Sequence, residues 1–122
     1  MSSFPTPQLL VDLETLDGAI EVVRARGAVD LLTGPELERS IEAALDKRPS
    51  AIIVDFSDVD FLASFGMSIL LRTNERVQAD THLVIVADGP ATSRPMAILG
   101  LTDVLSICPT LDAALKRLDQ AG

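Results

Sequence analysis

The sequence predicts a single α/β domain built on a mixed β-sheet. An Asp17-Gly18 pair separates two alternating segments, apolar runs occupy residues 51–56 and 82–87, and an amphipathic segment follows each run. An Asp-Gly pair in that setting indicates a hairpin, whose strands are antiparallel. Strands that alternate with helices are typical of parallel pairing. The expected order of elements is therefore β-β-α-β-α-β-α-(β)-α.

The composition is sufficient for one folded domain. The chain has 122 residues, of which 48% are hydrophobic, so a single core can form without disulfides. Residues 1–8 contain two prolines and two serines and predict a flexible tail, whereas residues 9–120 predict the domain. No internal repeat or low-complexity run indicates a further unit.

The first half of the domain predicts a hairpin, a helix and a central strand. Residues 9–27 predict two short strands joined by the turn described above. Residues 33–45 predict a helix, because Thr33 and Glu36 have the spacing of a capping box and leucine and isoleucine recur on one stripe. The run 51–56 is apolar on both alternating faces, which is typical of a strand covered on both sides.

The second half continues the alternation of helices and strands. The expected elements are a helix over 64–79, a strand over 82–87, a short helix from Thr92 or Ser93 to Leu99, an edge strand over 104–108 and a helix from Thr110. The last helix has an apolar face formed by Leu111, Ala114, Leu115 and Leu118.

The charge balance limits the expected partners. The 18 acidic residues outnumber the 10 lysines and arginines, which gives a formal net charge of -8. Such a surface repels nucleic acid and anionic membranes, so a basic protein surface is the expected partner. The N-terminal sequence lacks the pattern of a signal peptide, and no apolar run approaches the about 20 residues that a membrane span needs. A soluble, cytoplasmic protein is expected.

The single cysteine, Cys108, fits that compartment. One thiol cannot form an intrachain disulfide, and free cysteines are typical of a reducing cytoplasm. A buried, unreactive cysteine at the end of a strand is the favoured interpretation. A redox sensor that uses Cys108 remains an alternative.

Three aspartates at and just after the end of the predicted central strand raise the question of catalysis. Asp55, Asp58 and Asp60 could bind magnesium, and Asp55 could accept a phosphoryl group in a phosphotransfer protein. Aspartates that form a turn after the strand are the favoured interpretation. The sequence has no glycine-rich phosphate loop, and its only histidine, His82, completes no catalytic triad with Ser64. A protein that is not an enzyme and needs no cofactor or metal is therefore expected.

Ser64 is the polar residue that most needs an explanation, because it lies in the apolar stretch "DFLASFGMSILL". Serine is preferred at helix N-caps, where its hydroxyl accepts a bond from a first-turn amide. A helix start also receives a phosphate well, because free amides and the helix dipole favour negative charge. The sequence therefore predicts that Ser64 caps a helix and is suited to phosphorylation.

Three segments together resemble a known family. They are "RGAVDLLTGPELERSIEAAL", "AIIVDFSDVDFLASFGMSILLR" and "LTDVLSICPTLDAALKRL". They are similar to the STAS domain, which is named for sulphate transporters and anti-sigma factor antagonists. The resemblance implies a mixed sheet of four to five strands with about four helices packed mainly on one side.

The resemblance also assigns roles to residues around Ser64. Ser64 matches the serine that partner kinases phosphorylate in stand-alone antagonists, and Gly66 matches the motif glycine. Ala63, Phe65 and Ser68 stand where the family motif has Asp, Ser and Gly. The implied partner-binding residues are Asp30, Asp58, Asp60, Phe61, Leu62, Ala63, Ser64, Phe65, Met67 and Ser68.

The implied function is that of an anti-sigma factor antagonist. Such a protein binds an anti-sigma factor, often itself a serine kinase, and so releases a sigma factor. Phosphorylation at Ser64 would prevent binding and a phosphoserine phosphatase would restore it, in a protein expected to be a monomer or weak dimer. The alternative within the family is a binding module that is never phosphorylated, in a stressosome or as a transport accessory, which Ala63 favours.

Overall fold

A computed structural model describes residues 8–77 and 79–121 and shows the predicted α/β fold. Five strands form one sheet in the order β1-β2-β3-β4-β5. β1 pairs antiparallel with β2, and the other neighbours pair in parallel, so the sheet is mixed as expected. The strands are β1 (Leu9–Leu16), β2 (Ile20–Val29), β3 (Ala51–Leu62), β4 (His82–Val86) and β5 (Ile107–Cys108).

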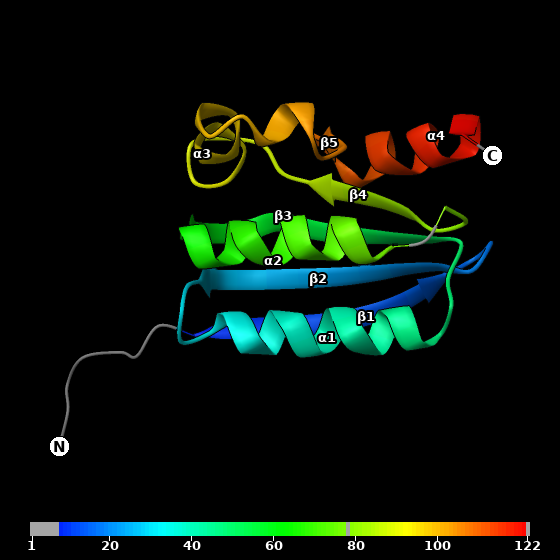
Figure 1. The fold of residues 1–122 in the computed structure, drawn as a ribbon, viewed down its shortest axis with the longest axis horizontal. Coiled ribbons are helices and arrows are strands. Elements are labelled where there is room, and N and C mark those ends of the chain that lie inside the picture. Colours follow the sequence, from blue (N-terminus) through cyan, green and yellow to red (C-terminus); the bar gives the residue numbers. More distant parts are fainter. Residues whose placement is uncertain (1–7, 78, 122) are drawn as a thin grey trace, which may run out of the picture.

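Helices cover the two faces of the sheet unequally (Figure 1). In the described residues they are α1 (Gly34–Asp46), α2 (Ser64–Arg76), α3 (Ser93–Ile98), the 3₁₀ turn η1 (Leu101–Asp103) and α4 (Leu111–Ala121). α1, α2, α3 and η1 contribute to the larger core, whereas α4 packs on the opposite face over Val22, Ile53 and Val84. Packing mainly on one side is therefore confirmed. Within the described segments, no helix has the length and apolar character that crossing a membrane requires.

The hairpin has the predicted turn. Leu16 pairs with Ile20, and Gly18 and Ala19 adopt positive φ angles of 83° and 59° in the connection. β2 continues two residues beyond the predicted end. The predicted tail, 1–8, lies outside the described residues except for Gln8, whose carbonyl accepts a bond of 3.2 Å from the Ala28 amide.

β3 is longer than predicted, and this corrects the expectation of a loop after residue 56. Asp55, Asp58 and Asp60 all lie within the strand and not in a turn. The additional residues pair in parallel with the far half of β2, through two register shifts. Such bulges let exposed polar residues interrupt the alternation without ending the ladder.

Neither predicted side-chain cap forms at α1 or α2. Thr33 occupies the N-cap position of α1, but its hydroxyl oxygen accepts the Asp30 amide at 3.0 Å instead of a first-turn amide, while the hydroxyl donates to the Ala28 carbonyl at 2.7 Å. Ser64 is the first residue of α2 and Ala63, with extended backbone, occupies the N-cap position. By contrast, the Thr110 hydroxyl accepts a bond of 3.0 Å from the Ala113 amide at the start of α4.

Smaller differences concern the ends of elements. α2 ends at Arg76 rather than residue 79, and the predicted edge strand is shortened to β5. The residues before β5 form η1, which follows Gly100 with its positive φ of 79°. Cys108 is buried on the α4 side of the sheet, as expected for an unreactive thiol.

Candidate functional site

The predicted site residues gather where β2 and β3 end and α1 and α2 begin. In Figure 1 these segments share the end of the sheet at which α3 also lies. Val29 pairs with Leu62 at the end of the ladder, and the Ala63 amide donates to the Val29 carbonyl at 2.9 Å. Because this bond joins the two connections, the turn at Asp30 and the start of α2 are held side by side.

The Asp30 carboxylate organises the turn before α1. Its Oδ1 accepts bonds from the amides of Leu32 (2.9 Å) and Thr33 (3.0 Å). The Thr33 amide is the main cause that lowers the pKa of Asp30, with the Leu32 amide and Thr33 hydroxyl adding to it and partial desolvation opposing it. The turn leaves Leu31 and Leu32 68% and 78% exposed. The hydrogen bonds of the charged carboxylate therefore fix a turn in which two apolar side chains are exposed to solvent.

The start of α2 leaves Ser64 accessible. Ser64 is exposed and precedes the first intrahelical donors, since the amides of Gly66 and Met67 both bond to the Ala63 carbonyl. No side chain in the described part of the chain caps this helix. The first amides of a helix have no intrahelical acceptor, and the helix dipole is positive there. The Ser64 hydroxyl therefore lies where a negative group would be stabilised.

Gly66 explains how closely α2 begins against the sheet. A Cβ atom at this position would lie 2.6 Å from both Leu62 Cδ1 and Val29 Cγ1. Side chains do not tolerate such contacts, so the motif glycine permits the first turn of α2 to pack directly on β2 and β3.

Phe65 links the starts of the two helices. Its half-buried ring lies against Gly34, where a Cβ atom would collide with it. The Arg72 guanidinium lies 5.9 Å from the centre of the ring and also donates to Glu38 of α1 at 2.9 Å. Phe65, which stands where the family motif has a serine, thus packs α2 against α1.

The predicted partner-binding residues divide by exposure. Leu62 and Met67 are each only 6% exposed and belong to the core. The sequence analysis counted both among the partner-binding residues, but their side chains are not at the surface. Asp58, Asp60, Phe61 and Ser64 are exposed, and Phe61 is 54% exposed. The others, Asp30, Ala63, Phe65 and Ser68, are half-buried. Ser68 donates its hydroxyl to the Phe65 carbonyl at 2.7 Å.

Leu31 and Leu32 were missed by the sequence analysis. They form an exposed apolar pair at the same end of the sheet as the exposed Phe61, whose neighbour in the ladder is Ala28. A Leu-Leu pair between the predicted strand that ends at residue 27 and the predicted helix that begins at residue 33 was the available signal. Apolar residues in a short turn have no core position to occupy.

Asp55 has a structural environment. Its carboxylate is 8% exposed, accepts bonds from the Ser57 amide (2.9 Å) and hydroxyl (2.5 Å), and lies 3.8 Å from Arg24 Nε. Arg24 in turn pairs with Glu14 of β1 at 2.9 Å. Over the ranges that the structure covers, no three His, Cys, Asp or Glu side chains are placed to hold a metal ion. Asp55 therefore links strands β1 to β3 through an ion-pair network.

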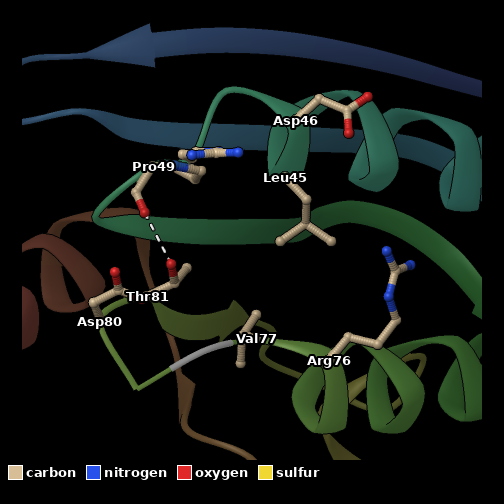
Figure 2. A pocket seen from close by; sticks show the side chains of 8 residues that line it. Leu45, Asp46, Pro49, Arg76, Val77, Asp80 and Thr81 are labelled. Atoms are coloured by element: carbon tan, nitrogen blue, oxygen red, sulfur yellow. Dashed lines mark hydrogen bonds between the residues drawn. The ribbon is translucent and has the colours of Figure 1, made fainter.

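A pocket of about 430 Å³ lies at the other end of the molecule, between the last turns of α1 and α2 (Figure 2). Leu45 and Val77 form its apolar wall, and Thr81 donates to the Pro49 carbonyl at 3.0 Å across its base. Arg76, which also lines it, is bound to Glu42. This pocket contains none of the predicted site residues.

Comparison with known proteins identifies the family. Residues 11–114 match the model of the STAS domain. The chain belongs to the STAS domain family. Its match to the anti-sigma-F factor antagonist RsfB of Mycobacterium tuberculosis is 34% identical over 96 residues, which are 79% of each chain.

Solved structures of this family have the same fold. An anti-sigma factor antagonist from Mycobacterium paratuberculosis is 38% identical and superposes with a TM-score of 0.88 over 92% of this chain and 95% of the other. The anti-sigma factor antagonist SpoIIAA in its unphosphorylated form is 21% identical, with a TM-score of 0.70 over 91% and 97% of the two chains, which supports the fold. These STAS proteins are named as antagonists, which are regulatory binding proteins and not enzymes, in agreement with the sequence analysis.

Proposed function

We propose that this STAS protein is an anti-sigma factor antagonist that binds an anti-sigma factor through the end of the sheet described above. The docking surface consists of Asp30, Leu31, Leu32, Asp58, Asp60, Phe61, Ala63, Ser64, Phe65 and Ser68. The names of the relatives support the partner class, and the exposure of Leu31, Leu32 and Phe61 supports the location. Exposed apolar side chains that cluster on one surface are typical of protein interaction sites.

The chemistry of this surface favours a partner with an apolar centre and basic edges. Leu31, Leu32 and Phe61 supply apolar area, and Asp58 and Asp60 are exposed on the adjoining part of β3. Opposite charges across an interface mainly raise the association rate and the specificity. A basic anti-sigma factor surface would therefore be attracted to the acidic edge and bound by the apolar residues.

Phosphorylation of Ser64 is the proposed switch. A partner serine kinase would transfer the γ-phosphoryl group of ATP to Ser64 Oγ: the new P–O bond forms as the bond to the β-phosphate breaks, ADP leaves, and the hydroxyl proton goes to a base of the kinase. The product brings a charge of about -1.5 to -2 to a helix start with free amides. Because Ser64 follows Phe61 at the end of the sheet and the Ala63 amide joins this segment to Val29, the phosphate would put charge and bound water into the proposed apolar contact.

The accessible hydroxyl of Ser64 at an uncapped helix start is the observation that supports this switch. Unphosphorylated protein would bind the anti-sigma factor in the cytoplasm and so release a sigma factor. A phosphoserine phosphatase would restore the binding form. Repulsion of a charged group from an apolar interface is expected to weaken binding by at least about tenfold.

The test combines intact-mass measurement with binding. After incubation with an anti-sigma factor kinase and ATP, the wild-type protein should gain one phosphate and Ser64→Ala should gain none. Ser68→Ala is the matched control, because Ser68 is one turn further along the same helix and should leave the modification unchanged. Ser64→Glu should bind the unmodified partner at least about tenfold more weakly than wild type does.

Three results would contradict parts of the proposal. If Ser64→Glu binds as tightly as wild type, the switch by charge is wrong. If no phosphate is gained while the anti-sigma factor still binds, the chain is a constitutive binding module, as Ala63 in place of the motif aspartate would favour. If Leu32→Asp and Phe61→Asp both leave binding unchanged, the docking surface lies elsewhere.

A further inference from the structure

We propose that a second pocket, at the end of the sheet opposite Ser64, binds an aliphatic polyamine. The amino-end pocket has a volume of about 390 Å³ and is formed by the turn between β1 and β2, the first residues of β2, β3 and β4, and the last turns of α4. A volume of this order is typical of sites for small organic molecules. Figure 1 shows α4 ending at this side of the sheet, away from the start of α2.

The lining of the amino-end pocket has a strong excess of negative charge. Asp17, Asp80 and Asp119 line it, and no lysine or arginine is among its lining residues in the described chain. None of the three aspartates forms a salt bridge with another described side chain. The three carboxylates come from different elements, so the fold brings them together around one cavity.

The end of α4 adds to this field. Asp119 lies in the last turn of the helix, and that turn contains no basic residue. The carbonyl groups at a helix C-terminus form the negative end of the dipole, where a cation is stabilising and a carboxylate is not. A bound cation would relieve the repulsion between Asp119 and the helix end.

The floor of the pocket requires a ligand with a hydrocarbon part. Ile20, Leu115 and Leu118 line it and are half-buried against the core under α4. The carboxylates are not grouped closely enough to hold a metal ion in the part of the chain described. Ammonium groups separated by short methylene chains match both features, because the charges can reach separate carboxylates while the methylenes cover the apolar floor.

The larger pocket in Figure 2 shows why the amino-end pocket is the better candidate. Asp46 and Asp80 line the larger pocket together with Arg48 and Arg76, so charges of both signs are already present there. A polycation entering that pocket would meet two guanidinium groups. Of these two pockets, the amino-end pocket is the one that combines carboxylates and an apolar floor with a lining without lysine or arginine among the described residues.

Nuclear magnetic resonance with spermidine as the probe tests this proposal directly. His82 lines the pocket and is the only histidine of the chain, so its ring signals report binding without assignment of a crowded spectrum. Titration at low salt should shift the His82 signals along a saturating curve. The amide signals that move should be those of the pocket rather than those around Ser64.

Variants distinguish a site from general attraction to an acidic protein. Asp119→Asn and Asp17→Asn should each weaken binding about two- to fivefold, since each removes one solvent-screened charge contact. Asp103→Asn is the matched control, because this aspartate is exposed in η1 outside the pocket and makes the same change in net charge. Leu118→Ser should also weaken spermidine binding, because it removes apolar floor without changing charge.

Two further ligands test whether spermidine binding needs both several charges and a hydrocarbon part. Butylamine and Mg²⁺ should bind more weakly than spermidine, because the first has one charge and the second has no hydrocarbon. The proposal is overturned if the curve does not saturate, if Mg²⁺ competes at equal concentration, or if Asp103→Asn weakens binding as much as Asp119→Asn. Tighter binding of trilysine than of spermidine would also overturn it, in favour of a basic protein segment. None of these results depends on Ser64 or on the docking surface.

Discussion

The two helices that begin where β2 and β3 end start in different ways. Before α1, Asp30 uses its carboxylate to accept the amides of Leu32 and Thr33 and its carbonyl to accept that of Gly34. At α2, the first amides find no such side chain in the described residues, and Ser64 stands exposed beside them. The start of α1 is therefore complete by itself, whereas the start of α2 has free amide donors for a group that arrives later.

The largest effect on this comparison is expected from the glycines at the two helix starts. Gly66→Ala should lower the free energy of unfolding by about 1–3 kcal/mol, because the new methyl group collides with the buried Leu62 and the stiff Val29. Gly34→Ala should cost less, since the ring of Phe65 is only half-buried and can move away. Urea unfolding of both variants checks the order. A larger loss for Gly34→Ala would contradict this account of the α2 start.

A smaller effect, which depends on pH, is expected from Asp30. Its pKa is lower in the folded protein than in the unfolded chain, so its stabilising contribution is fully present above the unfolded pKa of about 3.9 and is lost as the pH falls through the folded pKa. Asp30→Asn should therefore be less stable than wild type near neutral pH, and this difference should shrink in acid. Urea unfolding between pH 6 and the acid limit measures it.

The control for Asp30 is Asp103→Asn, which changes an exposed aspartate away from this turn. If the difference between wild type and Asp30→Asn stays constant down to the acid limit, the carboxylate charge does not hold the turn. Asp30→Asn is also expected to weaken partner binding, because Leu31 and Leu32 would lose their fixed position.

The smallest effect is expected at Ser64 and has the opposite sign. Ser64→Glu should raise the free energy of unfolding by about 0.3–1 kcal/mol at low salt, because a carboxylate at the first position of α2 interacts favourably with the helix dipole. Ser68→Glu, the matched control, should not be stabilised, since Ser68 is half-buried and its hydroxyl bonds to the Phe65 carbonyl. A loss of stability in Ser64→Glu would contradict an uncapped helix start.

These predictions separate stability from binding at one residue. Ser64→Glu is expected to be slightly more stable and yet to bind the anti-sigma factor more weakly. A merely damaged protein would lose both properties together. Thermal unfolding and partner binding of the same preparation therefore distinguish a charge switch from misfolding.

Much of the fold could be predicted from local patterns. The Asp17-Gly18 turn was recognised from its turn residues, the strands around Ile53 and Val84 from their continuous apolar runs, and the apolar face of α4 from its helical period. The membership in the STAS domain family was recognised from a resemblance between ordered segments. These features depend on a few neighbouring residues, which a sequence displays directly.

The errors occurred where two distant segments meet. Leu62 and Met67 were expected to face a partner but are buried, because Gly66 lets α2 pack tightly on β2 and β3. β3 continues past Asp58 since β2 offers a second half of the ladder. The Thr33 hydroxyl was expected to cap α1, but its oxygen accepts the amide of Asp30 instead.

The sequence by itself determined the α/β order, the hairpin, the acidic charge and the family, because these follow from residue periodicity, turn chemistry and motif spacing. The tertiary structure alone decided which side chains of the motif are exposed and which hydroxyls are already bonded. It also placed Asp17, Asp80 and Asp119 around one pocket, although they are far apart in the chain. The physical reason is that burial and electrostatic fields depend on neighbours in space, which only the packed sheet and helices bring together.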